Sequence, residues 1–420
     1  MKKILLPILI CFSSFSVNAQ AVADSIDMGE GYLNEVFYQL GTQAKTAVPF
    51  NGTGGWDIGF QTTLMNASII SDENSILVFK APNADSTDYA SLDVSGYAGW
   101  QQLYNSDSTW DKGAFNMGAD PSNYFDFGWG IYDFNTHEVY GDSLFVLVKG
   151  TDVYKLWIRK KTAGGDYILR YANTTLGGGD VDVTIPAASY SSKNFVYLNL
   201  ATPATIDLEP ASSDWDILFT RYFTYIPYAG MYPVTGVFSN TGVTVAQADS
   251  VDLSTVSYAD YSAGLSANLT EIGYDWKVFI QPYGPYVIVD SLIYFVKAKD
   301  NSIFSLHFTD FNSTTGKTYF ETEKLLTGID ELKGNLTQAV LYPNPSTDQV
   351  NIVCDALANS VLNVRMFDLT GRELLQYTYK VRSGLNVESL DLPEVSPGVY
   401  NLMLSTGDQQ VALKLMVIKQ

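Results

Sequence analysis

The sequence contains very little cysteine and histidine. Its cysteines are Cys11 and Cys354, and its histidines are His137 and His307. We expect Cys11 to be removed with a signal peptide, which leaves one cysteine in the exported chain. That count excludes an internal disulfide bond and a metal cluster held by cysteines.

Basic residues are also scarce. The chain has 25 Lys and Arg against 45 Asp and Glu, a formal net charge of −20 and a pI of about 4.3. Because nucleic-acid phosphates are bound by lysine and arginine, we expect no nucleic-acid partner. No stretch after the amino-terminal segment approaches the roughly 18 apolar residues of a membrane span, so we predict no transmembrane helix.

Aromatic residues are abundant. They make up 14% of the chain, with 28 Tyr, whereas charged residues make up only 17%. Alternating aromatic and β-branched stretches separated by Gly, Ser, Thr and Asn are typical of strands and turns. No segment of residues 32–326 sustains a helical period of 3.6 residues. We therefore predict an all-β extracellular protein.

The amino-terminal segment has the form of a signal peptide over residues 1–19. Lys2 and Lys3 supply the positive charge, and the apolar region follows at residues 4–15. Val17-Asn18-Ala19 places small residues at positions −3 and −1 of a cleavage site before Gln20. We expect export through the periplasm.

One short pattern occurs twice. Phe37-Tyr38 precedes Trp56-Asp57-Ile58-Gly59-Phe60, and Val196-Tyr197 precedes Trp215-Asp216-Ile217-Leu218-Phe219, with 18 residues from Tyr to Trp in both copies. Each copy predicts an aromatic strand, a connection and an alternating strand. The Trp-Asp pairs suggest either core packing or an aromatic platform for a sugar, and the alternation with Ile and Phe favours the core.

The duplication extends further along the chain. Residues 142–149 and 290–297 both begin with Asp-Ser-Leu and continue as an apolar strand. A tight turn and a second strand follow in each copy, which predicts two β-hairpins. We predict one repeat over 20–191, a second over 192–326 and a polar linker over 327–338. The region of residues 250–269 has room for a short helix.

The second repeat resembles a known family. The resemblance rests on Ser213-Asp214-Trp215-Asp216-Ile217, Ile272-Gly273-Tyr274-Asp275-Trp276-Lys277, the stretch of residues 292–300, Ile303-Phe304-Ser305-Leu306-His307-Phe308 and Thr315-Gly316-Lys317. These stretches are similar to the HmuY-like family of Bacteroidetes, all-β secreted or surface proteins whose characterised members bind haem. The resemblance covers most of 193–326 and, more weakly, 32–190. It implies two tandem HmuY-like units and haem, or a related porphyrin, as ligand.

Haem iron needs axial ligands such as His, Met, Cys or Tyr. His137, in an expected loop, and Met117 are the candidates for iron, and a pair of histidines cannot be assigned. Aromatic loops provide a surface on which a flat ligand, either a porphyrin or a sugar, can stack. The remaining ligand-binding candidates in these loops are Tyr124, Trp129, Tyr222 and Met231.

Two functions therefore stay open. One is a secreted or cell-surface ligand-binding protein, with haem as ligand by resemblance. The other is a surface adhesion or structural protein that binds a glycan or a protein through its aromatic loops. We do not expect an enzyme: Gly141-Asp142-Ser143-Leu144 spells a hydrolase signature, but a strand follows Ser143, and no Asp stands three residues before either histidine.

The tail has a different character. It lacks Trp, and nearly all the net negative charge lies before it. About seven short strands in some 80 residues predict a small Ig-like sandwich over 339–420. A turn at Asp368-Leu369-Thr370-Gly371-Arg372 places Gly where a positive φ is expected.

The tail resembles the type A C-terminal sorting domain of the type IX secretion system. The resemblance is carried by Tyr342, Pro343, Asn344, Pro345, Gly371, Pro397, Gly398, Tyr400 and Lys419. It implies recognition by the type IX machinery, removal of the tail, and release of the protein or its attachment at the cell surface.

Overall fold

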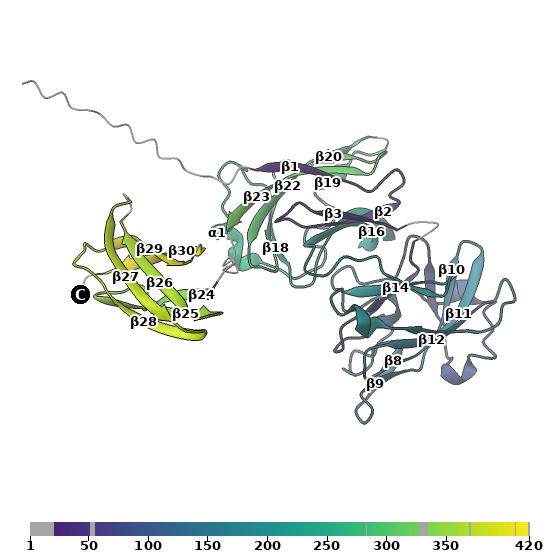
Figure 1. The fold of residues 1–420 in the computed structure, drawn as a ribbon. Coiled ribbons are helices and arrows are strands. Elements are labelled where there is room, and N and C mark those ends of the chain that lie inside the picture. Colours follow the sequence, from purple (N-terminus) through teal and green to yellow (C-terminus); the bar gives the residue numbers. More distant parts are fainter. Residues whose placement is uncertain are drawn as a thin grey trace, which may run out of the picture. The chain divides into compact units, whose positions relative to one another are not determined.

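The computed structural model describes residues 21–50, 55–282, 284–326, 335–368, 371–407 and 409–418. The expected signal peptide and most of the expected linker lie outside these residues. The chain divides into two compact units, residues 1–326 and 327–420, which are described separately. The all-β prediction is confirmed (Figure 1), because the described elements are almost all strands in antiparallel sheets.

Short helical segments interrupt the strands. The α-helix α1 (Tyr258–Tyr261) falls within residues 250–269, where a short helix was expected. Single 3₁₀ turns occur at η1 (Ser86–Asp88), η2 (Tyr97–Gly99), η3 (Ala114–Asn116), η4 (Ala187–Tyr190) and η5 (Ser262–Gly264).

The first unit contains two lobes, each with its own apolar core. The first lobe, residues 55–206, contains β4 (Ile58–Gln61), β5 (Ile69–Ser71), β6 (Leu77–Lys80), β7 (Gln102–Leu103), β8 (Gly130–Asp133), β9 (Glu138–Gly141), β10 (Leu144–Lys149), β11 (Asp152–Lys161), β12 (Tyr167–Asn173), β13 (Val181–Ile185), β14 (Phe195–Asn199) and β15 (Ala204–Ile206). One sheet has the order β13-β12-β11-β10-β6-β7 with β8 and β9 attached, and the other has the order β15-β14-β4-β5.

The second lobe combines residues 21–50 with residues 207–326. It contains β1 (Val22–Asp27), β2 (Asn34–Tyr38), β3 (Lys45–Pro49), β16 (Ile217–Ile226), β17 (Gly230–Ser239), β18 (Thr244–Ala248), β19 (Lys277–Phe279), β20 (Tyr286–Ile288), β21 (Ile293–Lys297), β22 (Ile303–Asn312) and β23 (Lys317–Leu326). Its sheets have the orders β1-β23-β22-β21-β18, β17-β16-β2-β3 and β19-β20. In Figure 1 the purple strands β1 to β3 accordingly lie among the green strands of this lobe.

The two copies of the Trp-Asp pattern exchange strands. β2 of the first copy pairs with β16 of the second, and β14 of the second pairs with β4 of the first. Residues 21–50 thus pack with the second core, although we expected them in a first repeat of residues 20–191. Local alternation decides which face of a strand is buried, but it does not identify the partner strand.

The aspartates of the two pairs fix this exchange. Asp57 accepts a hydrogen bond from the backbone N–H of Leu200 at 2.7 Å, and Asp216 accepts one from Leu40 at 2.9 Å. Asp57, at the start of β4, therefore binds the chain just after its partner strand β14. Asp216, at the start of β16, binds the chain just after its partner strand β2. Trp56 and Trp215 are both buried, in agreement with the core interpretation.

Hydrogen bonds and ring contacts join the lobes within the first unit. The indole N–H of Trp110, from the first lobe, donates to the Ser239 carbonyl at 2.9 Å, and its ring meets the Phe238 ring edge-to-face at 5.5 Å. The Asn74 side chain donates to the Arg221 carbonyl at 3.0 Å. Trp110, Phe238 and Arg221 also line the cavity described below.

The second unit has seven described strands, the number predicted for the tail. They are β24 (Leu336–Tyr342), β25 (Gln349–Ala356), β26 (Ser360–Phe367), β27 (Glu373–Val381), β28 (Gly384–Asp391), β29 (Gly398–Thr406) and β30 (Gln409–Val417). Sheets of order β24-β25-β28 and β27-β26-β29-β30 contribute to a single apolar core, which includes the buried Cys354. Burial raises the pKa of the Cys354 thiol.

Candidate functional site: an aromatic surface and an interlobe cavity

The candidate iron ligands His137 and Met117 both lie at the surface. His137 occupies the turn of the β8–β9 hairpin with a φ of 58°, and its Nδ1 atom is 2.7 Å from the hydroxyl of Tyr132. Met117 follows η3 with 48% of its surface exposed. Neither residue lines the cavity between the lobes.

Four rings beside His137 form a cluster, here called the aromatic hairpin surface: Tyr124, Phe125, Tyr132 and Phe134. Phe125 contacts Phe134 edge-to-face with centroids 4.4 Å apart and lies 6.1 Å from Tyr132 in a stacked orientation. Tyr124 is 91% exposed and Phe134 is 62% exposed. The sequence-based expectation of an aromatic loop at this position thus corresponds to a group of mutually supported rings that face solvent.

Trp129 does not belong to this surface. Its ring is completely buried in the core of the first lobe, where its N–H donates to the Ala67 carbonyl at 2.9 Å. Its proposed role in ligand binding was based on its position in the aromatic loop. The chain turns inward at Trp129, because Gly128 before it takes a φ of 82°.

A second set of exposed rings lies at the tip of the β16–β17 hairpin. Tyr225, Tyr228 and Tyr232 are exposed there, and Met231 is 36% exposed. Tyr222, from the same expected loop, is instead buried and lines the cavity between the lobes. The two candidates of this region, Tyr222 and Met231, therefore lie in different environments.

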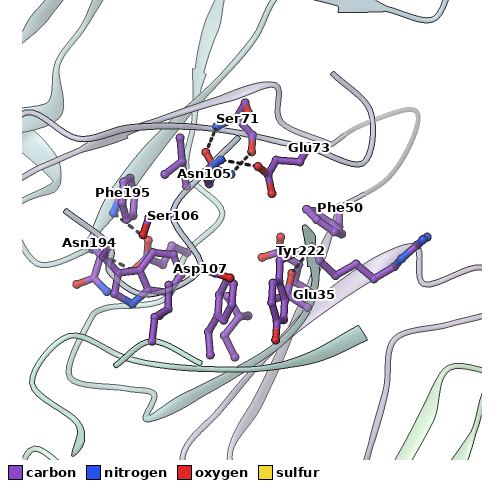
Figure 2. Close-up of a pocket in the computed structure, with 18 of the residues that line it drawn as sticks. Glu35, Phe50, Ser71, Glu73, Asn105, Ser106, Asp107, Asn194, Phe195 and Tyr222 are labelled. Carbon is purple, nitrogen blue, oxygen red and sulfur yellow. Dashed lines mark hydrogen bonds between the residues drawn. The ribbon is translucent and has the colours of Figure 1, made fainter. Parts of the chain in front are cut away.

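The interlobe cavity has a volume of about 50 Å³ and is lined by residues of both lobes. Aromatic rings dominate the lining, and they include Phe50, Trp56, Trp110, Phe195, Trp215, Tyr222, Phe223 and Phe238. Figure 2 shows Glu35 of the second lobe and Glu73 of the first lobe on opposite sides of this space. Sequence reasoning missed the cavity because its lining comes from many separate segments that share no motif.

Three carboxyl groups in the lining are buried. The backbone N–H groups of Asn105 and Phe223 donate to Glu73, and burial raises its pKa to about 8. Glu209 accepts hydrogen bonds from the backbone N–H groups of Asn194 and Phe195, each at 2.9 Å, and burial raises its pKa to about 7.

Glu35 differs from these two. Burial raises its pKa well above the ordinary value, and the nearby carboxylates of Asp72 and Glu209 raise it further. Among the described residues, the Thr220 side chain is its hydrogen-bond partner. Within this part of the chain Glu35 therefore has fewer partners than Glu73 or Glu209.

The sorting motifs hold the edge of the tail sandwich together. The Asn344 side chain donates to the Lys414 carbonyl at 2.7 Å and accepts from the Met416 N–H at 2.8 Å. Tyr400 donates to the Ser396 carbonyl at 2.6 Å, next to Pro397 and Gly398. Gly371 has a φ of 83°, as predicted for its turn, and Lys419 lies outside the described residues.

Comparison with known proteins identifies one segment. Residues 340–419 match a family model described as a secretion system C-terminal sorting domain. No curated protein matches the chain. Among the described residues, no helix is long and apolar enough to cross a membrane.

Two solved structures show distant similarity. A polysaccharide lyase is 10% identical, with a TM-score of 0.19, over 96% of this chain and 47% of its own. Dimeric latent PorU from Porphyromonas gingivalis is 10% identical, with a TM-score of 0.18, over 84% of this chain and 31% of its own. This chain thus spans less than half of either structure, and at these TM-scores neither comparison supports a shared fold. The family match shows that the protein carries a type IX C-terminal sorting domain at residues 340–419, which directs it to the cell surface or the extracellular space.

Proposed function

We propose that this exported protein is an extracellular glycan-binding protein that contacts its ligand through the aromatic hairpin surface. The observation that supports this function most directly is the exposure of Tyr124 and Phe134 on rings that pack beneath them. Such a group of exposed apolar rings is uncommon on a protein that binds nothing. Sorting to the cell exterior places these rings where glycans are encountered.

The support beneath the exposed rings matters for this function. Phe125 packs against Tyr124, Tyr132 and Phe134, so that the exposed rings keep their orientation without a ligand. Aromatic side chains with two rotatable bonds lose little conformational entropy on binding. Asn135, next to Phe134 in the hairpin turn, is exposed and carries an amide group that can hydrogen-bond to hydroxyls.

The test is a glycan array with the protein and a Tyr124→Ala/Phe134→Ala double variant. We expect the wild type to bind a defined set of glycans and the double variant to lose at least tenfold in affinity. Tyr228→Ala is the matched control, because it removes an equally exposed tyrosine from the other hairpin tip. Equal loss in the control, or no loss in the double variant, would assign binding to another surface.

Haem is a second candidate for the same surface. Besides the HmuY-like resemblance, it is favoured by the position of His137, whose ring centroid lies 6.2 Å from that of Tyr132. The Tyr132 hydroxyl lies within hydrogen-bonding distance of Nδ1, which leaves Nε2 as the nitrogen for iron. A metal-bound histidine usually donates its other ring N–H to a neighbouring acceptor, and the Tyr132 oxygen would be that acceptor.

A titration of the protein with haem, followed by the Soret band, tests this candidate. A saturable, sharpened band that weakens in His137→Ala would support haem on the hairpin surface, and the same loss in Met117→Ala would identify a second ligand. A spectrum equal to that of free haem would rule haem out and leave the glycan function untouched.

A further inference from the structure

The interlobe cavity presents mostly negative or electron-rich groups. Its described lining includes the acids Glu35, Glu73, Asp107 and Glu209, a set of aromatic rings and one basic residue, Arg221. The Arg221 guanidinium packs over the Tyr32 ring with its centre 5.4 Å from the ring centroid, and Tyr32 does not line the cavity. In its ionised form this lining is therefore complementary to a cation.

The buried acids Glu35, Glu73 and Glu209 form no ion pair within the part of the chain that the structure describes. Burying an ionised carboxylate without a counter-charge is costly, so these groups hold their protons more tightly than usual. A bound cation would stabilise their ionised forms.

The aromatic rings of the cavity and the Trp215 N–H, which is unpaired in the described structure, indicate which kind of cation fits there. Trp56 and Trp110 line the cavity, and indole faces attract organic ammonium groups. Trp215 lines it too, and its buried N–H has no acceptor within the described structure. A ligand oxygen beside the ammonium group would supply that acceptor.

Size and ligand geometry restrict the occupant to a small molecule. A cavity of about 50 Å³ holds a few water molecules, which makes it too small to enclose a sugar ring or a porphyrin. In the part of the chain that the structure describes, no group of three or more His, Cys, Asp or Glu side chains is arranged to hold a metal ion. A small ammonium group meets both restrictions.

We propose that the interlobe cavity binds a small organic ammonium group with a neighbouring hydroxyl, with Glu35 and Glu73 as its counter-ions and the Trp56 and Trp110 rings around it. This site is separate from the aromatic hairpin surface, and the proposal does not depend on glycan binding there. Glu35 is the central residue, because it is fully buried and its carboxyl group has the Thr220 side chain as its hydrogen-bond partner among the described residues.

The test compares ethanolamine with ethylene glycol, which has a hydroxyl in place of the ammonium group. Tryptophan fluorescence and calorimetry should show saturable binding of ethanolamine at pH 7 and none of ethylene glycol. Binding should release protons, which appears as a dependence of the measured heat on the ionisation enthalpy of the buffer. Ethylene glycol binding as tightly as ethanolamine, or ethanolamine binding without proton release, would overturn the proposal.

Two variants locate the site. Glu35→Gln keeps the size of the side chain and should weaken ethanolamine binding at least tenfold while leaving the circular dichroism spectrum unchanged. Glu30→Gln, at an exposed position outside the lining, should bind as the wild type does. If Glu35→Gln fails to fold, Trp110→Phe provides the second test, since a weaker ring face should still lower the affinity. Unchanged affinity in the folded variants would refute the assignment.

Discussion

The two lobes of the first unit use the same Trp-Asp pair at equivalent points but satisfy its carboxylate differently. In the first lobe Asp57 is fully buried, and Lys149 donates to it at 2.7 Å. In the second lobe Lys299, which lies in the turn after the equivalent strand, donates instead to the carbonyl and hydroxyl of Ser212. Among the described residues, the hydrogen-bond partner of Asp216 is the Leu40 backbone N–H, and burial raises the pKa of Asp216 to about 6.

This difference shows that a duplicated motif can keep its structural role and lose its electrostatic one. Both aspartates still bind the N–H at the end of the exchanged strand. In the described structure Asp57 also has a cation within hydrogen-bonding distance, Lys149, whereas Lys299 lowers the pKa of Asp216 without forming an ion pair with it. The same sequence pattern is therefore expected to respond differently to substitution and to pH in the two lobes.

The largest effect is expected from Asp57→Asn. The variant keeps an acceptor for Leu200 but leaves the partly buried Lys149 ammonium without its counter-charge, which should lower the free energy of unfolding by about 2–4 kcal/mol. Urea unfolding followed by tryptophan fluorescence measures this change. Adding Lys149→Met should recover part of the loss, and a double variant no more stable than Asp57→Asn would argue against the ion pair as the cause.

A smaller effect, visible mainly through pH, is expected from Asp216→Asn. The folded-state pKa of Asp216 is about 6 and the ordinary value is 3.8, so the native state binds this proton more tightly. The contribution of this group to stability is greatest below about pH 4 and falls as the pH rises to about 6, by roughly 1–3 kcal/mol.

Asp216→Asn should remove that part of the pH dependence. The variant should match or exceed the stability of the wild type at pH 7, whereas Asp57→Asn should be destabilised there. Unfolding curves at pH 4, 5, 6 and 7 give the comparison. A difference curve between wild type and Asp216→Asn that stays flat over this range would contradict the raised pKa.

The smallest change in stability is expected from two buried serines, one in each lobe. Ser71 and Ser239 pair with Ile58 and Ile217 at equivalent positions, and each buries a hydroxyl that has no partner in the described structure. Ser71→Ala and Ser239→Ala should each change the free energy of unfolding by less than about 0.5 kcal/mol, or stabilise slightly, because no hydrogen bond is lost. A loss above about 1 kcal/mol in either variant would indicate a partner, such as a buried water.

Much of the local structure could be predicted from the sequence. The alternation after Trp56 and Trp215 indicated the strands β4 and β16, and the Gly371 turn was located correctly. The tail was recognisable because its motifs recur in a fixed order. In these places one short segment contains all the information that the local structure requires.

The strand exchange and the cavity could not be predicted in the same way. Glu35 lies in a short alternating strand and looks like a solvent-facing residue until β16 and the first lobe surround it. Trp129 and Tyr222 lie in aromatic loops whose sequence does not show which ring turns inward. These properties depend on contacts between residues far apart in the chain, which local patterns do not encode.

The strand exchange also sets the order in which the first unit can assemble during synthesis. β1, near the amino terminus, pairs with β23, the last strand before the tail, and β2 pairs with β16. β1 therefore has no partner strand until nearly the whole unit has been synthesised, and the β2–β3 hairpin lacks its neighbour in the sheet until β16 follows. Such a chain stays unfolded longer than one built from consecutive, self-contained domains, and an unfolded chain is the form that can still be threaded through a membrane channel.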